Sequence, residues 1–108
     1  MSAPFDIVAL IYPKLGKADR VEELLKITAA AVKANEPGTL RYQVHRETNG
    51  DAPTIIMLET YKDQASLQAH GTSKDFKELG RAFKKEDLLA APMKVLFTKK
   101  VGGYASKL

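Results

Sequence analysis

The order in which strand-like and helix-like hydrophobic patterns alternate constrains the fold of this chain more than any other feature. Residues 5–12 are apolar on both faces and precede Pro13, which is typical of a strand buried on two sides. Residues 16–35 carry apolar side chains at helical spacing, with acidic residues in the first turns, and Pro37 and Gly38 follow the last turn. The chain therefore begins with a predicted strand and an amphipathic helix.

Two consecutive strands are predicted after this helix. Residues 39–47 alternate apolar and polar side chains, residues 48–53 form a turn cluster, and residues 54–61 are again strand-like and mostly apolar. Because the two segments are separated only by the turn cluster, we expect them to form a hairpin.

The second helical region is predicted to be broken in two. Asp63 is a suitable N-cap for a short helix through His70, Ser73 for another through about Lys85, and residues 93–100 form a last strand. The complete order is that of an α+β, ferredoxin-like fold: an antiparallel sheet with helices on one face.

A sheet of this kind leaves one face without helices. Residues 5–12 and 54–61 are apolar on both sides, so both faces of the sheet favour burial. A chain of 108 residues also buries a smaller share of its surface than a larger one. The sequence therefore predicts a homodimer in which two such sheets pack face to face.

Composition and charge exclude several classes of function. The chain has no cysteine, which excludes disulfides, thiolate metal sites and cysteine nucleophiles. Because it has neither an apolar run of about 18 residues nor a signal-peptide pattern at the N-terminus, no membrane or secretory role is expected. The net charge is +4, but the basic residues of 74–85 alternate with acidic ones, which indicates a solvated helix face and no nucleic-acid partner.

The RNA-recognition motif has the same order of strands and is the main alternative for a binding function. Its third strand needs aromatic side chains that stack on bases. Residues 54–61 read Thr-Ile-Ile-Met-Leu-Glu-Thr-Tyr, so the aromatic signature is absent.

Several separate segments together resemble the antibiotic biosynthesis monooxygenase family, over roughly residues 5 to 100. They are Glu-Pro-Gly-Thr-Leu-Arg-Tyr-Gln-Val at 36–44, Glu-Thr-Tyr-Lys-Asp at 59–63, Leu67, Ala69-His70 and Ser73 through Lys77. The resemblance implies a homodimer whose two sheets form a shared barrel. It also implies one of three activities: cofactor-free oxygenation of anthrones and quinols, haem degradation, or isomerisation of a phosphorylated signal sugar derivative.

The resemblance is closest to the quinol monooxygenase and isomerase branches. The haem-degrading branch fits poorly, because Tyr61 stands in place of a Trp, Gly80 in place of the haem-ligating His, and the first strand has no Asn. No second His or carboxylate lies at ligand spacing, so neither a metal site nor a cofactor is expected.

Chemistry without a cofactor needs an enclosed apolar pocket, a base and donors that hold an anion. If residues 47 and 54 pair, one hairpin surface carries Tyr42 opposite Glu59 and Leu40 opposite Tyr61, together with Val44 and Met57. Burial on that surface would raise the pKa of Glu59 toward that of a useful base.

We accordingly predict Glu59, His70 and Tyr61 as catalytic residues and Tyr42, Met57, Phe76 and Phe83 as substrate-binding residues. The alternatives are a structural hydrogen bond or salt bridge for Glu59 and a core or capping role for His70. His45 projects to the opposite strand face and is predicted at the dimer interface.

Three functions are compatible with these residues. The leading one is a cofactor-independent monooxygenase of small aromatic or quinol-like metabolites. The others are an isomerase of a small, phosphorylated dicarbonyl, in which Arg41 or a nearby lysine holds the anion, and a non-catalytic carrier of a small ligand.

The last residues predict a location. We expect a domain over residues 1–101 and a flexible tail over 102–108, which begins with Gly102-Gly103. The tail ends in Ser106-Lys107-Leu108, the peroxisomal import signal when it stands at a free C-terminus. This predicts a peroxisomal protein that binds the import receptor; the alternative is a cytoplasmic protein in which the tripeptide has no role.

Overall fold

The predicted order of strands and helices is confirmed by the structure, a computed structural model in which residues 3–108 are described. Each observed end lies within two residues of the predicted one. The elements are β1 (Phe5–Ile11), α1 (Ala18–Asn35), β2 (Thr39–Arg46), β3 (Ile55–Tyr61), α2 (Gln64–Gly71), α3 (Lys74–Lys85) and β4 (Lys94–Thr98).

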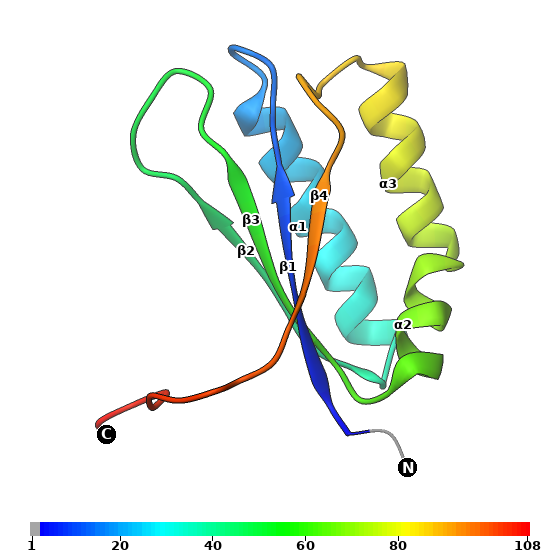
Figure 1. Ribbon diagram of the computed structural model, residues 1–108. Helices are drawn as coiled ribbons and strands as arrows, with labels where there is room; N and C mark the ends of the chain where they lie inside the picture. The colour runs from blue at the N-terminus through cyan, green and yellow to red at the C-terminus, as the bar shows by residue number, and fades with distance from the viewer. Residues whose placement is uncertain (1–2) are drawn as a thin grey trace.

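The four strands form one antiparallel sheet in the order β2-β3-β1-β4, with all three helices on one face (Figure 1). In β1 the side chains of Ile7, Ala9 and Ile11 are buried beneath the helices, and those of Val8 and Leu10 between them are half-buried on the other face. The strict alternation in β1 and β3 gives the sheet one helix-covered face and one open face.

Both predicted caps of the second helical region are present. The Asp63 carboxylate accepts a hydrogen bond from the backbone N–H of Ser66 at 2.8 Å, and the Ser73 hydroxyl accepts one from Phe76 at 3.1 Å. Because each cap satisfies a free N–H of a first turn, the chain stops and restarts its helix at Ser73. The break turns α2 and α3 into separate supports for the site described below.

The predicted hairpin register is confirmed over most of its length and wrong at one end. Tyr42 pairs with Glu59, and the backbone N–H of Glu47 donates to Thr54 at 2.9 Å, as expected. However, Thr39 and not Leu40 lies opposite Tyr61, because a β-bulge shifts the register between residues 39 and 41. The extra residue turns the Leu40 side chain out of the core, where it is 56% exposed.

The open face of the sheet carries a group of half-buried aliphatic side chains. They are Val8 and Leu10 of β1 and Ile56 and Leu58 of β3, and they lie beside Leu96 of the edge strand β4, which is 39% exposed. Among residues 3–108, no helix lies on this face of the sheet (Figure 1). The sheet-to-sheet homodimer stays a prediction.

The segment after β4 leaves the sheet and runs away from the body of the molecule without helix or strand (Figure 1). Lys100 ties its start to β1 through an ion pair with Asp6, in which Nζ and Oδ2 are 3.2 Å apart. Leu108 is fully exposed, and the peroxisomal location stays a prediction. Among the described residues, no helix is both long enough and apolar enough to cross a bilayer.

Candidate functional site

A cavity of about 440 Å³ lies between the helix-covered face of the sheet and the layer formed by α2 and α3. All seven residues predicted from the sequence contribute to its wall: Tyr42, Met57, Glu59, Tyr61, His70, Phe76 and Phe83. Most of the remaining wall is apolar, with Ile7 and Ala9 of β1 at the sheet and Leu79 of α3 above them. The fold therefore places these residues around one space, while their roles in binding or catalysis stay predictions.

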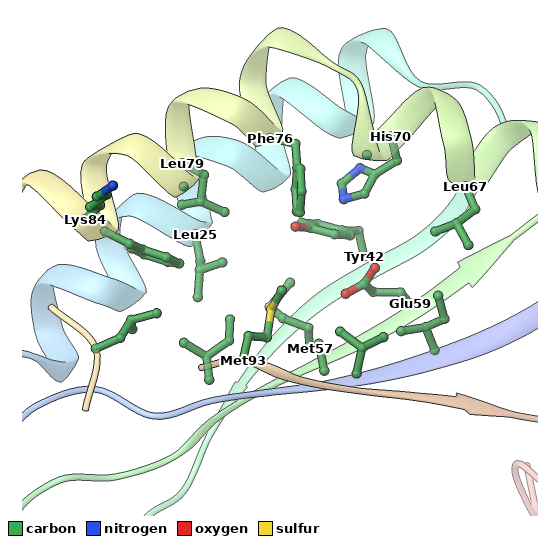
Figure 2. A pocket seen from close by; sticks show the side chains of 18 of the residues that line it. Leu25, Tyr42, Met57, Glu59, Leu67, His70, Phe76, Leu79, Lys84 and Met93 are labelled. Atoms are coloured by element: carbon green, nitrogen blue, oxygen red, sulfur yellow. The ribbon is translucent and has the colours of Figure 1, made fainter. Parts of the chain in front are cut away.

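The polar groups gather at one end of the cavity. Glu59 of β3 is directly opposite Tyr42 of β2, and His70 of α2 closes this end from above (Figure 2). Glu59 is 8% exposed and His70 is 4% exposed. A carboxyl, a phenol and an imidazole are thus removed from bulk water but reach the same space.

Glu59 is held in place by Tyr61, two residues further along β3. The buried Tyr61 hydroxyl donates a hydrogen bond to Glu59 Oε1. Burial raises the pKa of Glu59, and the Tyr61 hydrogen bond offsets part of this effect by stabilising the carboxylate. The structural hydrogen bond considered from the sequence exists, and it occupies only one of the two carboxyl oxygens.

Both tyrosines are kept in the phenol form. Burial, followed by the charge of Glu59, raises the pKa of Tyr61 and the pKa of Tyr42. A hydroxyl that resists ionisation remains a hydrogen-bond donor, which is what stabilisation of a substrate anion requires.

An aromatic cluster surrounds the imidazole of His70. The ring centre of Tyr42 is 5.1 Å from that of His70, and the ring centre of Phe76 is 4.9 Å away on another side. Both ring planes are tilted relative to the imidazole, by 57° and 53°, a common geometry for packed aromatic rings. The cluster restricts the His70 ring to a narrow range of orientations.

Glu36 is the residue of this region that the sequence analysis missed. Its Oε1 is 2.8 Å from Nδ1 of His70, and the two side chains are only 10% and 5% exposed. Glu36 is the C-cap residue of α1, where a negative charge is unfavourable next to the helix dipole. An acidic residue at the C-terminal end of a predicted helix was therefore the signal in the sequence that could have indicated a role for Glu36 outside the helix.

The other end of the cavity is apolar and was also not predicted. Leu25 of α1 and Met93 before β4 line it, with Lys84 of α3 at its edge (Figure 2). The segment after α3 is tied to the segment after β1 at this end, because the backbone N–H of Ala90 donates to the carbonyl of Tyr12 at 2.7 Å and that of Lys14 donates to the carbonyl of Leu88 at 2.7 Å. An elongated ligand would therefore meet acid–base groups at one end and aliphatic groups at the other, where Lys84 and Asp87 are the charged residues of the lining.

No group of three or more His, Asp or Glu side chains that could hold a metal ion occurs among residues 3–108. The arrangement as it stands can accept a proton at His70, deliver one from Glu59, and donate a hydrogen bond from Tyr42. These are the elements of general acid–base chemistry on an enclosed apolar molecule.

Comparison with known proteins identifies the family. Residues 4–82 match the model of the family described as antibiotic biosynthesis monooxygenase. A curated Bacillus subtilis (strain 168) protein, named "Putative monooxygenase YcnE", is 32% identical over 94 residues, which are 85% of this chain and 95% of that protein.

Two solved structures are also similar over nearly their whole length. One is the crystal structure of a "putative antibiotic biosynthesis monooxygenase" from Caulobacter crescentus CB15, with a TM-score of 0.82, 30% identity and coverage of 93% of this chain and 92% of that one. The other is PA3566 from Pseudomonas aeruginosa, with a TM-score of 0.81, 26% identity and coverage of 94% and 98%. The family model spans more than half of the chain and the relatives agree with it, so this protein belongs to the antibiotic biosynthesis monooxygenase family.

Proposed function

We propose that this protein is a cofactor-independent monooxygenase of small aromatic substrates that carry an acidic C–H or hydroxyl group, such as anthrones and quinols. The observation that carries the proposal is the polar end of the cavity, where Glu59, His70 and Tyr42 face one space of about 440 Å³ with mostly apolar walls. A cavity of this size matches a small multi-ring molecule.

The reaction is balanced without an added reductant. His70 accepts the first C–H proton of an anthrone, and the Tyr42 hydroxyl donates a hydrogen bond to the resulting enolate oxygen. The carbanion adds O₂, and Glu59 protonates the peroxide. The Glu59 carboxylate takes the second C–H proton as the O–O bond breaks, which leaves one oxygen atom as the new carbonyl. The departing hydroxide takes the first proton back from His70 and leaves as water, so both residues return to their starting forms.

The unequal environments of the two proton carriers support this division of roles. Burial raises the pKa of Glu59, so this carboxyl keeps its proton to a higher pH than an exposed one does and is suited to donate it. His70 instead has a carboxylate, Glu36, on its Nδ1 side. An imidazole placed in this way is suited to accept a proton at its other nitrogen.

We propose that the active form is a homodimer through the open face of the sheet. Val8, Leu58 and their neighbours give that face an aliphatic centre, and charged and polar residues such as Arg41, Gln43 and His45 of β2 lie at its edge. An apolar centre with a polar rim is the usual anatomy of a protein–protein interface. Light scattering at micromolar concentration is expected to give twice the mass of the chain; a stable monomer would contradict this assembly.

The oxygenase proposal is tested by oxygen uptake with a panel of anthrones and quinols. With ¹⁸O₂, the product is expected to gain one labelled oxygen atom and the water the other. Glu59→Gln and Tyr61→Phe are expected to slow turnover, and Glu78→Gln on the exposed side of α3 is the matched control that keeps it.

Two other outcomes would each overturn the proposal in favour of a different function. Conversion of a phosphorylated dicarbonyl without oxygen uptake would indicate an isomerase, with Lys84 as the cation nearest the cavity. Tight binding of aromatic molecules without turnover, unchanged in Glu59→Gln and Tyr61→Phe, would indicate a ligand carrier.

A further inference from the structure

The contact between Glu36 and His70 joins two residues that are 34 positions apart in the sequence. Oε1 of Glu36 lies 2.8 Å from His70 Nδ1 and also 2.8 Å from the hydroxyl of Thr39, which donates to it. Glu36 does not belong to the cavity wall, so its carboxylate stands behind the imidazole as seen from the cavity. Among the described residues, its only hydrogen bond to a residue of that wall is the one to His70.

The chemistry of these atoms fixes the protonation of the imidazole. A carboxylate has no proton to give and can only accept, so a hydrogen bond at this distance requires that Nδ1 of His70 carries the hydrogen. In the neutral ring the other nitrogen, Nε2, then holds a free lone pair. Among the described residues, the hydrogen bond to Glu36 is the only one made by the His70 ring, which leaves Nε2 available on the cavity side.

The segment that carries Glu36 is held tightly against α2. The backbone N–H of Lys62 donates to the carbonyl of Gly38 at 2.8 Å, and a Cβ added at Gly38 would lie 2.5 Å from Cβ of Ser66. Only glycine allows the backbone to come this close to the first turn of α2. The close approach brings Glu36, at the end of α1, within reach of His70 in α2.

We propose that Glu36 is a positioning residue that holds His70 as the Nδ1–H tautomer, with the Nε2 lone pair directed at the substrate. The catalytic part of this inference rests on the proposed function, in which His70 is the base. The tautomer itself does not, because it follows from the hydrogen bond alone.

Nitrogen-15 NMR of the imidazole rings tests the tautomer directly, since a protonated ring nitrogen and one with a lone pair have different shifts. The chain contains two histidines, and His45 on the exposed strand β2 serves as an internal reference. The wild-type protein is expected to show Nδ1–H at His70. Nε2–H at this ring would overturn the proposal.

Two variants of Glu36 separate positioning from mere packing. Glu36→Met keeps the length of the side chain but removes the acceptor, so His70 is expected to become a mixture of tautomers and kcat to fall about 10- to 100-fold with little change in KM. Glu36→Gln keeps an acceptor oxygen and is expected to retain the Nδ1–H tautomer and more of the activity. A sharp Nδ1–H signal in Glu36→Met would overturn the inference.

The controls keep this result distinct from the fate of the oxygenase proposal. Glu78→Met on α3 removes an exposed carboxylate and is expected to change neither the His70 signals nor kcat. If no substrate is oxidised by any form of the protein, the proposed function fails while the NMR result still decides the role of Glu36. If Glu36→Met does not fold, the wild-type and Glu36→Gln spectra decide it.

Discussion

The two faces of the sheet are built from the same strands but differ in the burial and the chemistry of their side chains. Neighbouring residues such as Met57 and Leu58 point to opposite sides: Met57 is buried in the core under the helices, and Leu58 is half-buried on the open face. The helix-covered face holds the cavity with its acid–base groups, and the strand residues on the open face are aliphatic or surface polar side chains. We infer that one face carries the chemistry and the other the assembly.

The largest expected effect tests whether the chemistry is confined to one face. His70→Asn is expected to lower kcat about 10²- to 10⁴-fold, because the site loses its proposed base. His45→Asn is the matched control on the open face and is expected to change kcat less than about twofold. Steady-state oxygen uptake measures both, and equal losses in the two variants would contradict the separation of the faces.

A pair of substitutions at adjacent positions tests whether core and interface are separate. Met57→Ala is expected to lower the free energy of unfolding by about 2–5 kcal/mol, because it removes a fully buried side chain and leaves a cavity. Leu58→Asp is expected instead to convert the proposed homodimer to a monomer, because it places a charge at the centre of the proposed interface.

Denaturant unfolding and light scattering distinguish the two outcomes. The circular dichroism of the Leu58→Asp monomer should remain that of a folded α+β protein. A Leu58→Asp variant that stays dimeric would place the interface elsewhere.

A smaller effect is expected at the point where the loop before β2 meets α2. Gly38→Ala places a methyl group against Ser66 and is expected to lower the free energy of unfolding by about 1–3 kcal/mol. Ser66→Gly removes the obstructing side chain, so the double variant should lose less than the sum of the two single losses. Strictly additive losses would show that the two residues do not meet.

The smallest expected effect concerns the pH dependence of stability. The unfolded chain binds the Glu59 proton with the ordinary pKa of 4.5, and burial raises this pKa in the folded protein. Between the two values the folded state binds more protons, so the free energy of unfolding decreases as the pH rises through this window. Urea titrations from about pH 4 to 8 should show this decrease in the wild-type protein and a weaker one in Glu59→Gln.

The sequence determined most of the fold because its signals are local. The period of the apolar residues identified each strand and helix, and the Asp63 and Ser73 caps located the break between α2 and α3. Strand alternation also placed Tyr42 and Glu59 on the same face. In each case residues close in the sequence, or joined by one short turn, carry the whole signal.

The hydrophobic pattern alone was not sufficient to predict every side chain near the candidate site. The β-bulge at residues 39–41 moved Leu40 out of the core, because Leu40 is the inserted residue and has no partner on β3. The bulge leaves no mark in the hydrophobic pattern, which reads the same with or without it.

Only the tertiary structure decided which distant groups meet at the cavity. Glu36 reaches His70 because Gly38 lets the chain approach Ser66 closely, and Met93 closes the apolar end because the segment after α3 returns to β1. Such contacts depend on how packed elements place groups that are far apart along the chain. The sequence therefore determined the elements and the strand residues of the site, and the packing of loops against helices determined the partner of its histidine.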